Sequence, residues 1–272
     1  MNSLPISIII PVSKDIKIKQ CLDSVDEQVE IVVVLNNKPS REVIEIVNSD
    51  YRCRTFMVEE TGCNLAAIFN KGIEIATNRK VLLTNSDCLF PPGLIFKINL
   101  LLENYDVVKA RVKFAFKNNK QRLVAECRRL FHHVFDGGTK LFGPGLSFHK
   151  DIHNKIGGYF FDERIDWGED GELSSRIYEA NLNYYIVNDC LFHDEENILH
   201  DLSVAWRIGR GSRQKNKNKK DFFLEILEVN WHDPKNRIQI AYSEGGYSLA
   251  IYFFTWRVMT YLGYYFGKKR GV

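Results

Sequence analysis

Short apolar runs alternate with segments of helical spacing in the first part of the chain. The β-branched run ISIIIPV (6–12) precedes residues 17–28, where apolar residues recur every three or four positions, and a second run, EIVVVLNN (30–37), follows. Strands with little internal alternation are typical of a parallel sheet that is covered on both faces. The pattern therefore predicts a strand, a helix and a second, parallel strand.

The same alternation continues beyond this unit. Helical spacing at residues 41–49 leads to a strand at 53–60, and a second helix at 64–77 leads to a fourth strand, KVLLTNS (80–86). Four strands joined by helices predict a Rossmann-like layered half with a mostly parallel central sheet, an α/β fold.

The second half of the chain does not continue this regular alternation of strands and helices. A helix is expected at 91–104 after a Pro-Pro-Gly turn, and strands are expected at 106–116 and 183–194. Residues 137–150 are rich in glycine, and residues 151–182 predict a short helix, a loop and a further helix. From about residue 200 the chain is expected to be helical and basic.

The C-terminal segment 247–267 is rich in tyrosine and phenylalanine and is interrupted by Arg257. It has the length of a membrane-spanning helix, but an arginine near the centre of a span costs about 2.5–3.5 kcal/mol. Tyrosine and tryptophan favour the membrane interface. Three alternatives follow: a helix docked on the protein, an interfacial membrane helix, and a true span.

Composition and charge narrow the function classes. The chain has 272 residues, 45% of them hydrophobic and 26% charged, as expected for a folded globular protein. A net charge of +3 does not indicate a nucleic-acid binder. Positive charge gathers in RQKNKNKK (213–220) and GKKR (267–270), which suit either a solvated loop or an anionic membrane surface.

Cysteine usage and the N-terminal sequence bear on location. Six widely spaced cysteines without a Cys-x-x-Cys pair favour a reducing compartment and give no zinc or disulfide framework. The start MNSLPISIII lacks the basic region and cleavage site of a signal peptide. We therefore expect a cytoplasmic protein, with the inner face of the cell membrane as the place of any peripheral attachment.

Carboxylates and one histidine stand where strands and loops end. The P-loop and the G-x-G-x-x-G motif are absent. Asp87 closes the fourth strand, Glu169 and Asp170 open a helix, and His193 closes the last strand. Each alone also suits a structural role, as a turn residue, a helix N-terminal acid or a locally bonded histidine. Together they outline a metal-assisted transfer site: Asp and His can hold Mn²⁺ or Mg²⁺ beside substrate phosphates, and another carboxylate can act as general base.

The order of these motifs resembles that of the family 2 glycosyltransferases, inverting enzymes of the GT-A fold that use nucleotide-diphosphate sugars. Four segments carry the likeness: SIIIPV, TGCNLAAIFNKGIEIATNRKVLLTNSDC, GPGLSFHKDIHNKIGGYFFDERIDWGEDGELSSRI and FHDEENILHDLSVAWRIGRGS. The resemblance implies a GT-A catalytic domain over residues 1–200, with a nucleotide-binding half at about 1–105 and an acceptor half at about 106–200. Residues 201–272 form the helical C-terminal extension.

The resemblance also implies roles for the acidic residues and the histidine. The family's D-x-D motif reads Asn85-Ser86-Asp87 here, with Asp87 as the metal ligand and His193 completing the metal site. An amide at position 85 can bond a hydroxyl but brings no charge, so metal binding should be weakened rather than lost. Asp170 corresponds to the catalytic base, and Glu169 would orient it or contact the acceptor.

Further positions are carried over for the two substrates. After the second strand the family usually has an aspartate that contacts the nucleotide base, whereas this chain has Asn36 and Asn37. Phe69 stands where an arginine is common. Remaining donor-site residues implied by the resemblance are Pro11, Asn70, Lys71, Asn85, Arg207 and Arg210, the two arginines being equally consistent with a solvated helix face. Gly145 and Trp167 are expected on the acceptor side, and Trp167 suits a packed core position as well.

The sequence thus predicts an inverting glycosyltransferase that moves a sugar from a nucleotide-diphosphate donor to a saccharide or lipid-linked acceptor, in surface polysaccharide or glycolipid synthesis. Two alternatives stay open. A catalytically degenerate nucleotide- or glycan-binding protein is favoured by the asparagines at positions 36, 37 and 85. A sugar nucleotidyltransferase would need a glycine-rich loop after the first strand, and PVSKDIK has no glycine.

Overall fold

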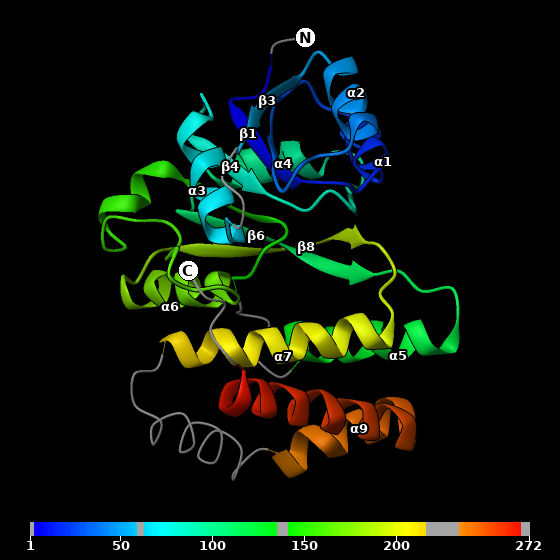
Figure 1. The fold of residues 1–272 in the computed structure, drawn as a ribbon. Helices are drawn as coiled ribbons and strands as arrows, with labels where there is room; N and C mark the ends of the chain where they lie inside the picture. Colours follow the sequence, from blue (N-terminus) through cyan, green and yellow to red (C-terminus); the bar gives the residue numbers. More distant parts are fainter. Residues whose placement is uncertain (1–2, 59–62, 135–140, 216–233, 268–272) are drawn as a thin grey trace. The chain divides into compact units, whose positions relative to one another are not determined.

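The computed structural model describes residues 3–58, 63–134, 141–215 and 234–267. The chain divides into two compact units (Figure 1). A sheet unit comprises Met1–Lys113, Lys140–Glu163 and Glu169–Asp194, and a helical unit comprises Phe114–Thr139, Arg164–Gly168 and Glu195–Val272. The boundary between a catalytic domain (1–200) and a C-terminal extension (201–272) stays a prediction from the sequence.

Within the described residues, the sheet unit is built on one eight-stranded sheet of order β3-β2-β1-β4-β7-β6-β8-β5. The fold class expected from the sequence, α/β with helices around a central sheet, is confirmed. The strands are β1 (Ile6–Val12), β2 (Glu30–Leu35), β3 (Cys53–Met57), β4 (Lys80–Leu83), β5 (Cys88–Leu89), β6 (Val107–Phe114), β7 (Leu146–His149) and β8 (Tyr184–His193).

The first four strands form the parallel half of the sheet. β1 pairs in parallel with β2 and β4, and β2 pairs in parallel with β3. Ile8 and Ile9 on β1 are both fully buried because helices cover both faces of the sheet. Ile8 belongs to the core beneath α1 (Ile18–Asp23), α2 (Arg41–Ser49) and α4 (Leu94–Leu101), and Ile9 to the core beneath α3 (Leu65–Ile75) and α6 (Glu169–Glu179).

Local chemistry sets where the covering helices begin and how closely they approach. The Ser40 side chain accepts a hydrogen bond from the Val43 amide at the start of α2, and Asn64 does the same for Ala67 at the start of α3. Gly72 lets α3 lie against the sheet, since a Cβ there would be 2.3 Å from Ile9 Cγ2. The predicted order of strands and helices over residues 6–86 is confirmed.

The other half of the sheet runs largely antiparallel. β7 pairs antiparallel with both β4 and β6, and β5 pairs antiparallel with β8. The glycine-rich segment 137–150 therefore contains a strand, Leu146–His149, that the sequence pattern did not indicate. β5 has two residues, too few for a period-two signal. Short strands of this kind are defined by their neighbours rather than by their own sequence.

The helical unit is organised around a buried ion pair. It contains α5 (Asn119–Arg129), a π-helix (Leu130–Val134), α7 (Ile198–Lys215) and α9 (Pro234–Phe266), which is broken at Gly245–Gly246. The fully buried Asp201 carboxylate accepts hydrogen bonds from Arg128 Nε and the Tyr252 hydroxyl, each at 2.6 Å. Such a charge needs these partners because burial removes its water.

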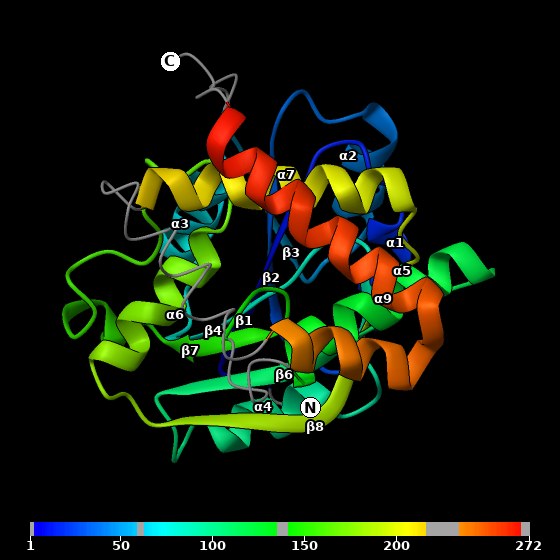
Figure 2. The same cartoon turned by 90° about the horizontal axis from the view of Figure 1, so that it is seen from below.

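Two glycines allow α7 and α9 to touch along their backbones. A Cβ at Gly209 would lie 1.9 Å from the Thr260 carbonyl oxygen, and one at Gly263 would lie 2.1 Å from that of Trp206. Figure 2 shows the C-terminal part of α9 (red) crossing α7 (yellow). Among the described residues, no helix combines the length and the apolar character needed to cross a membrane.

A carboxyl pair before β2 gives a pH-dependent stability. Burial and the hydrogen bond with Asp26 raise the pKa of Glu27 from an ordinary 4.5 to about 7. Between these values the native state holds a proton that the unfolded chain has lost, so the free energy of unfolding falls as pH rises from 4.5 to 7. Glu27→Gln removes this charge, and urea titrations should show a near-neutral effect at pH 4.5 but stabilisation at pH 8. The exposed Glu42→Gln is the control; a pH-independent effect of Glu27→Gln would contradict the assignment.

Candidate active site

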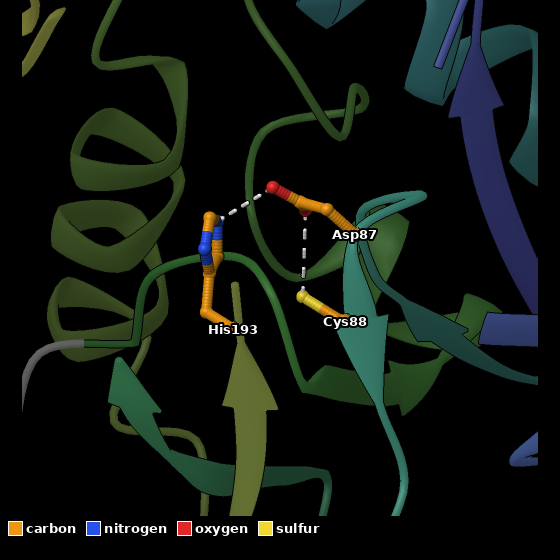
Figure 3. A group of neighbouring side chains, drawn as sticks. All are labelled: Asp87, Cys88 and His193. Atoms are coloured by element: carbon orange, nitrogen blue, oxygen red, sulfur yellow. Dashed lines mark hydrogen bonds and ion pairs between the residues drawn. The ribbon is translucent and has the colours of Figure 1, made fainter. Parts of the chain in front are cut away.

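Asp87 and His193 meet at the point where two distant segments pair. In the β5–β8 ladder Cys88 stands opposite His193, and the Asp194 amide donates to the Asp87 carbonyl at 3.2 Å. Both aspartate and histidine thus lie at strand ends, as expected from the sequence. Figure 3 shows their side chains pointing toward one another.

The histidine is oriented by its own backbone neighbour. His193 Nδ1 donates to the Asp194 carbonyl at 3.1 Å, because a carbonyl can only accept. In the neutral ring this leaves Nε2 as the basic nitrogen, 3.6 Å from Asp87 Oδ2. The His193 ring is buried, whereas the Asp87 side chain is 22% exposed. The pair therefore has one oriented imidazole and one carboxylate that solvent or a ligand can reach.

Cys88 is the third member of the cluster. Each of Asp87, Cys88 and His193 offers one ligand atom within 4.8 Å of the others. Burial, with the neighbouring Asp87 charge, raises the pKa of the Cys88 thiol to about 12, so the thiol is protonated at neutral pH. Mn²⁺ and Mg²⁺ favour carboxylate oxygen and imidazole nitrogen over thiols. Asp87 and His193 fit such an ion, with further positions left for phosphate oxygens.

A cation that the sequence analysis did not select stands beside this cluster. Lys17, just before α1, forms an ion pair with Asp194, and this bond raises the pKa of its ammonium. On the same side, Ser86 Oγ donates to Asp15 Oδ2 at 2.8 Å. Lys17 follows the first strand, a position where sequence reasoning searched for glycines and found none.

The asparagines expected to contact the nucleotide lie at the same edge of the sheet. The Asn36 amide donates to the Val12 carbonyl at 3.0 Å, and Asn37 Nδ2 donates to Asn36 Oδ1 at 2.9 Å. Pro11 is in register with Val34 on the neighbouring strand. The structure therefore brings these three residues to the carboxyl ends of β1 and β2.

Asn85 begins the turn that carries Asp87. Its carbonyl accepts a hydrogen bond from the Cys88 amide at 3.3 Å, which closes the turn between β4 and β5. The Thr84 amide donates to the Ile9 carbonyl at 3.1 Å, so this turn follows directly from the parallel ladder. Asn85 and Asp87 therefore share the carboxyl edge with Pro11 and Asn36.

Asn70 and Lys71 are engaged elsewhere. Asn70 exchanges hydrogen bonds with the backbone of Phe161, at 2.9 and 3.0 Å, and donates to Glu163 at 2.8 Å. Lys71 pairs with Glu74 at 2.8 Å. A hollow of about 360 Å³ opens beside Asn70, between α3 and the segment that follows β7, and includes Lys150 in its wall. Because the Lys150 amide donates to the Arg79 carbonyl just before β4, this hollow lies at the edge of the sheet opposite Asp87.

Glu169 and Asp170 form the first turn of α6. Glu169 is buried, and Asp170 Oδ1 accepts a hydrogen bond from the Gly171 amide at 2.7 Å. Acidic side chains are stabilised there by the partial positive charge of the helix N-terminus. The Asp170 carboxylate is therefore held at the N-terminus of α6.

Gly145 joins the end of β4 to the start of the antiparallel half. Its amide donates to the Leu83 carbonyl at 2.7 Å, and its carbonyl accepts from the Ala110 amide at 2.9 Å. Its φ of 83° lies in the left-handed region, and a Cβ would stand 3.2 Å from Ala110 Cβ. The segment expected beneath the acceptor is therefore fixed next to the strand that leads to Asp87.

A buried lysine supports this segment and was missed by the sequence analysis. Lys109 on β6 is 2% exposed, and its ammonium donates to the Pro144 carbonyl at 2.9 Å and to the Ala110 carbonyl. The Phe142 ring lies 4.3 Å from Nζ. Burial lowers the pKa of Lys109 to about 7, although the Asp170 charge opposes this shift. The feature of the sequence that could have indicated this buried lysine is its position inside the apolar run DVVKARV.

The remaining predicted residues belong to the helical unit and lie together there. The Arg207 guanidinium stands 4.4 Å from the Trp167 ring centroid and covers that face of the indole. Arg210 pairs with Asp166 at 3.7 Å. A Cβ at Gly211 would lie 1.7 Å from the Trp167 carbonyl oxygen, so α7 holds the 164–168 segment by close contact.

Lys109 should give the protein a second pH-dependent stability. Because its native pKa of about 7 is below the ordinary 10.5, the unfolded chain binds more protons between these values. The contribution of Lys109 to the free energy of unfolding therefore rises with pH across this range. Lys109→Met should flatten that rise in urea titrations at pH 7 and 9.5, whereas the exposed Lys113→Met on the same strand should not. An unchanged slope in Lys109→Met would contradict a titrating buried amine.

Comparisons with known structures reveal the same fold in S. aureus TarS. A crystal structure of TarS 1-349 aligns with a TM-score of 0.55 and 13% identity over 95% of this chain and 88% of that one. TarS 1-349 in complex with UDP aligns with a TM-score of 0.54 and 15% identity over 94% and 88% of the two chains. The complex with UDP-GlcNAc aligns with a TM-score of 0.53 and 14% identity over 95% and 89%. At these identities the likeness concerns the fold.

No curated protein matches the sequence. The profile of Glycosyl transferase family 2 matches residues 7–160, which include β1 to β4, the Asn85–Asp87 turn and Gly145. This match covers more than half of the chain. Together with the GT-A type of sheet, it shows that the chain belongs to glycosyl transferase family 2.

Proposed function

We propose that this glycosyltransferase transfers a sugar, with inversion, from a nucleotide-diphosphate donor to a hydroxyl of a saccharide or lipid-linked acceptor. The observation that carries the proposal is the pairing of Asp87 with an oriented His193 at the carboxyl edge of the sheet. TarS is structurally similar and forms complexes with UDP and UDP-GlcNAc, so UDP is the first nucleotide to test. Surface polysaccharide or glycolipid synthesis is the process that uses such a reaction.

Asp87 and His193 are the residues that would hold a divalent cation, Mn²⁺ or Mg²⁺. Such an ion, when bound, neutralises the charge that develops on a departing diphosphate. Pro11, Asn36 and Asn37 would contact the nucleoside, and Asn85 would bond a sugar or ribose hydroxyl as an uncharged acceptor or donor. Asn70 and Lys71 would act on the donor indirectly, through the segments they hold.

Asp170 is the proposed general base. An ionised carboxylate at the start of α6 can accept the proton of an acceptor hydroxyl as that oxygen attacks the anomeric carbon. The buried Glu169 beside it would orient the acceptor or Asp170 itself. Gly145 would let the backbone approach the acceptor sugar. The nucleoside diphosphate leaves from the opposite face of the sugar ring, which gives inversion.

The helical unit is proposed to contribute charge and an apolar contact. Arg207 and Arg210 would supply positive charge to the diphosphate, and Trp167 would offer the uncovered part of its ring to a sugar. Residues 213–272 would bring the enzyme to a membrane surface at the inner face of the cell membrane. The basic and aromatic composition of this region supports that placement.

A second candidate is a degenerate relative that binds a nucleotide or glycan without turnover. It is favoured by the amides at Asn85 and at Asn36 or Asn37, positions where the family usually has aspartates. The ordered carboxylates at Asp87 and Asp170 argue for the enzyme. The two candidates differ in turnover, not in nucleotide binding.

Calorimetric titration of UDP with and without Mn²⁺ tests the donor site. We expect UDP to bind, and Mn²⁺ to strengthen this binding. In Asp87→Ala the UDP affinity measured with Mn²⁺ should fall at least about tenfold, because the loss of a residue that only supports a metal ligand already has an effect of this size. Asp189→Asn, an exposed change on β8, is the matched control and should bind like the wild type. If UDP, GDP and dTDP all fail to bind the folded protein, the donor-site proposal is wrong.

Turnover of the Asp170→Asn variant tests the base. An amide cannot accept the acceptor's proton, so kcat should fall by about 10²–10⁴-fold while calorimetric UDP affinity stays near that of the wild type. Glu179→Gln, at the exposed end of the same helix, should keep full turnover. Full turnover in Asp170→Asn would reject this base, and loss of UDP affinity would indicate a structural role instead.

A further inference from the structure

The second segment of α9, after the break at Gly245–Gly246, has two unlike faces. One face is in the core of the helical unit, where Leu249, Phe253 and Trp256 are at most 3% exposed. The opposite side, which we call the α9 face, consists of Tyr247, Ile251, Phe254 and Val258, which are 73%, 63%, 57% and 37% exposed. Spacings of four, three and four residues place these side chains along one side of the helix.

The α9 face carries no charge. Arg257 is the single charged residue between positions 245 and 267, and its guanidinium lies 6.0 Å from the Phe131 ring centroid, toward the helical unit's own core. Phe266, at the end of the helix, is a further exposed apolar residue, with 68% of its surface accessible. Single exposed apolar residues are ordinary, but a continuous row over several turns marks an interaction surface.

Charge at one end of the helix indicates what kind of partner fits. Arg213, at the end of α7, donates to the Tyr265 carbonyl at 3.2 Å, so α7 and α9 finish side by side. In the sequence these two ends lead into the basic runs RQKNKNKK (213–220) and GKKR (267–270), of which residues 216–220 and 268–270 lie outside the described part of the chain. No acidic residue follows Glu244. In the sequence, the end of α9 is therefore followed by basic residues and by no acidic one.

We propose that the α9 face lies on an anionic lipid bilayer, with its aromatic and aliphatic side chains in the interface. A helix with an apolar face, rich in tyrosine and phenylalanine and flanked by lysine and arginine, has the composition of an interfacial helix. A second copy of the chain would bring the same positive charge to this end of the helix. The inference rests on the membrane placement in the proposed function and names the residues that make the contact.

Flotation of the full chain with vesicles tests this surface. We expect binding to mixed vesicles of phosphatidylglycerol and phosphatidylcholine, and little binding to phosphatidylcholine alone. Salt at about 1 M should release the bound protein, because it screens the attraction between the protein and the anionic lipid. An Ile251→Ser, Phe254→Ser double variant should reduce the bound fraction at least about tenfold, because the apolar contact scales with buried area. Tyr51→Ser, which changes an 82% exposed residue of the sheet unit, should bind like the wild type.

Three results would overturn the inference: no binding to either vesicle, equal binding by the double variant, or a concentration-dependent dimer in sedimentation that the double variant abolishes. The last would assign the α9 face to a second copy. Circular dichroism checks that the double variant is folded, since the substitutions leave the buried side of α9 intact. UDP calorimetry on the same preparations separates the two proposals, because a failed membrane surface leaves nucleotide binding unchanged and a failed donor site leaves vesicle binding unchanged.

Discussion

The candidate active site depends on a two-residue antiparallel contact. Cys88 and Leu89 pair with the end of β8, and this backbone ladder brings Asp87 and His193 within 3.6 Å of one another. Among the described strands β5 is the end strand of the sheet and pairs with β8 alone, so this one ladder sets the positions of both residues. A site that must bind a charged diphosphate benefits from ligands whose positions are set before the substrate arrives.

The change from parallel to antiparallel pairing serves the same site. β7 lies between β4 and β6 and carries Gly145 to the end of β4, where the parallel strands present their carboxyl ends. The buried Lys109 ammonium holds this junction through the Pro144 and Ala110 carbonyls. Burial of an amine costs free energy, so its presence here indicates that the position of the segment matters more than maximal stability.

In the helical unit, one side of each long helix is buried in a common core. The Asp201 cluster and the glycines of α7 and α9 hold the two helices in contact. Aromatic residues on both sides of the second segment of α9 mean that only half of its apolar surface can enter this core. The other half stays exposed as the α9 face, the surface that we propose to lie on an anionic bilayer.

The sequence by itself determined the parallel half of the fold, from Ile6 to Leu83, because buried strands and amphipathic helices leave periodic signals. It also identified Asp87, Asp170 and His193 as separate candidates at strand and helix ends, through a resemblance that extends over most of the chain. Only the tertiary structure decided that Asp87 and His193 meet, that Lys109 is buried beneath Gly145, and that Asn70 bonds Phe161. These facts depend on contacts between residues far apart in the chain, which local periodicity cannot encode.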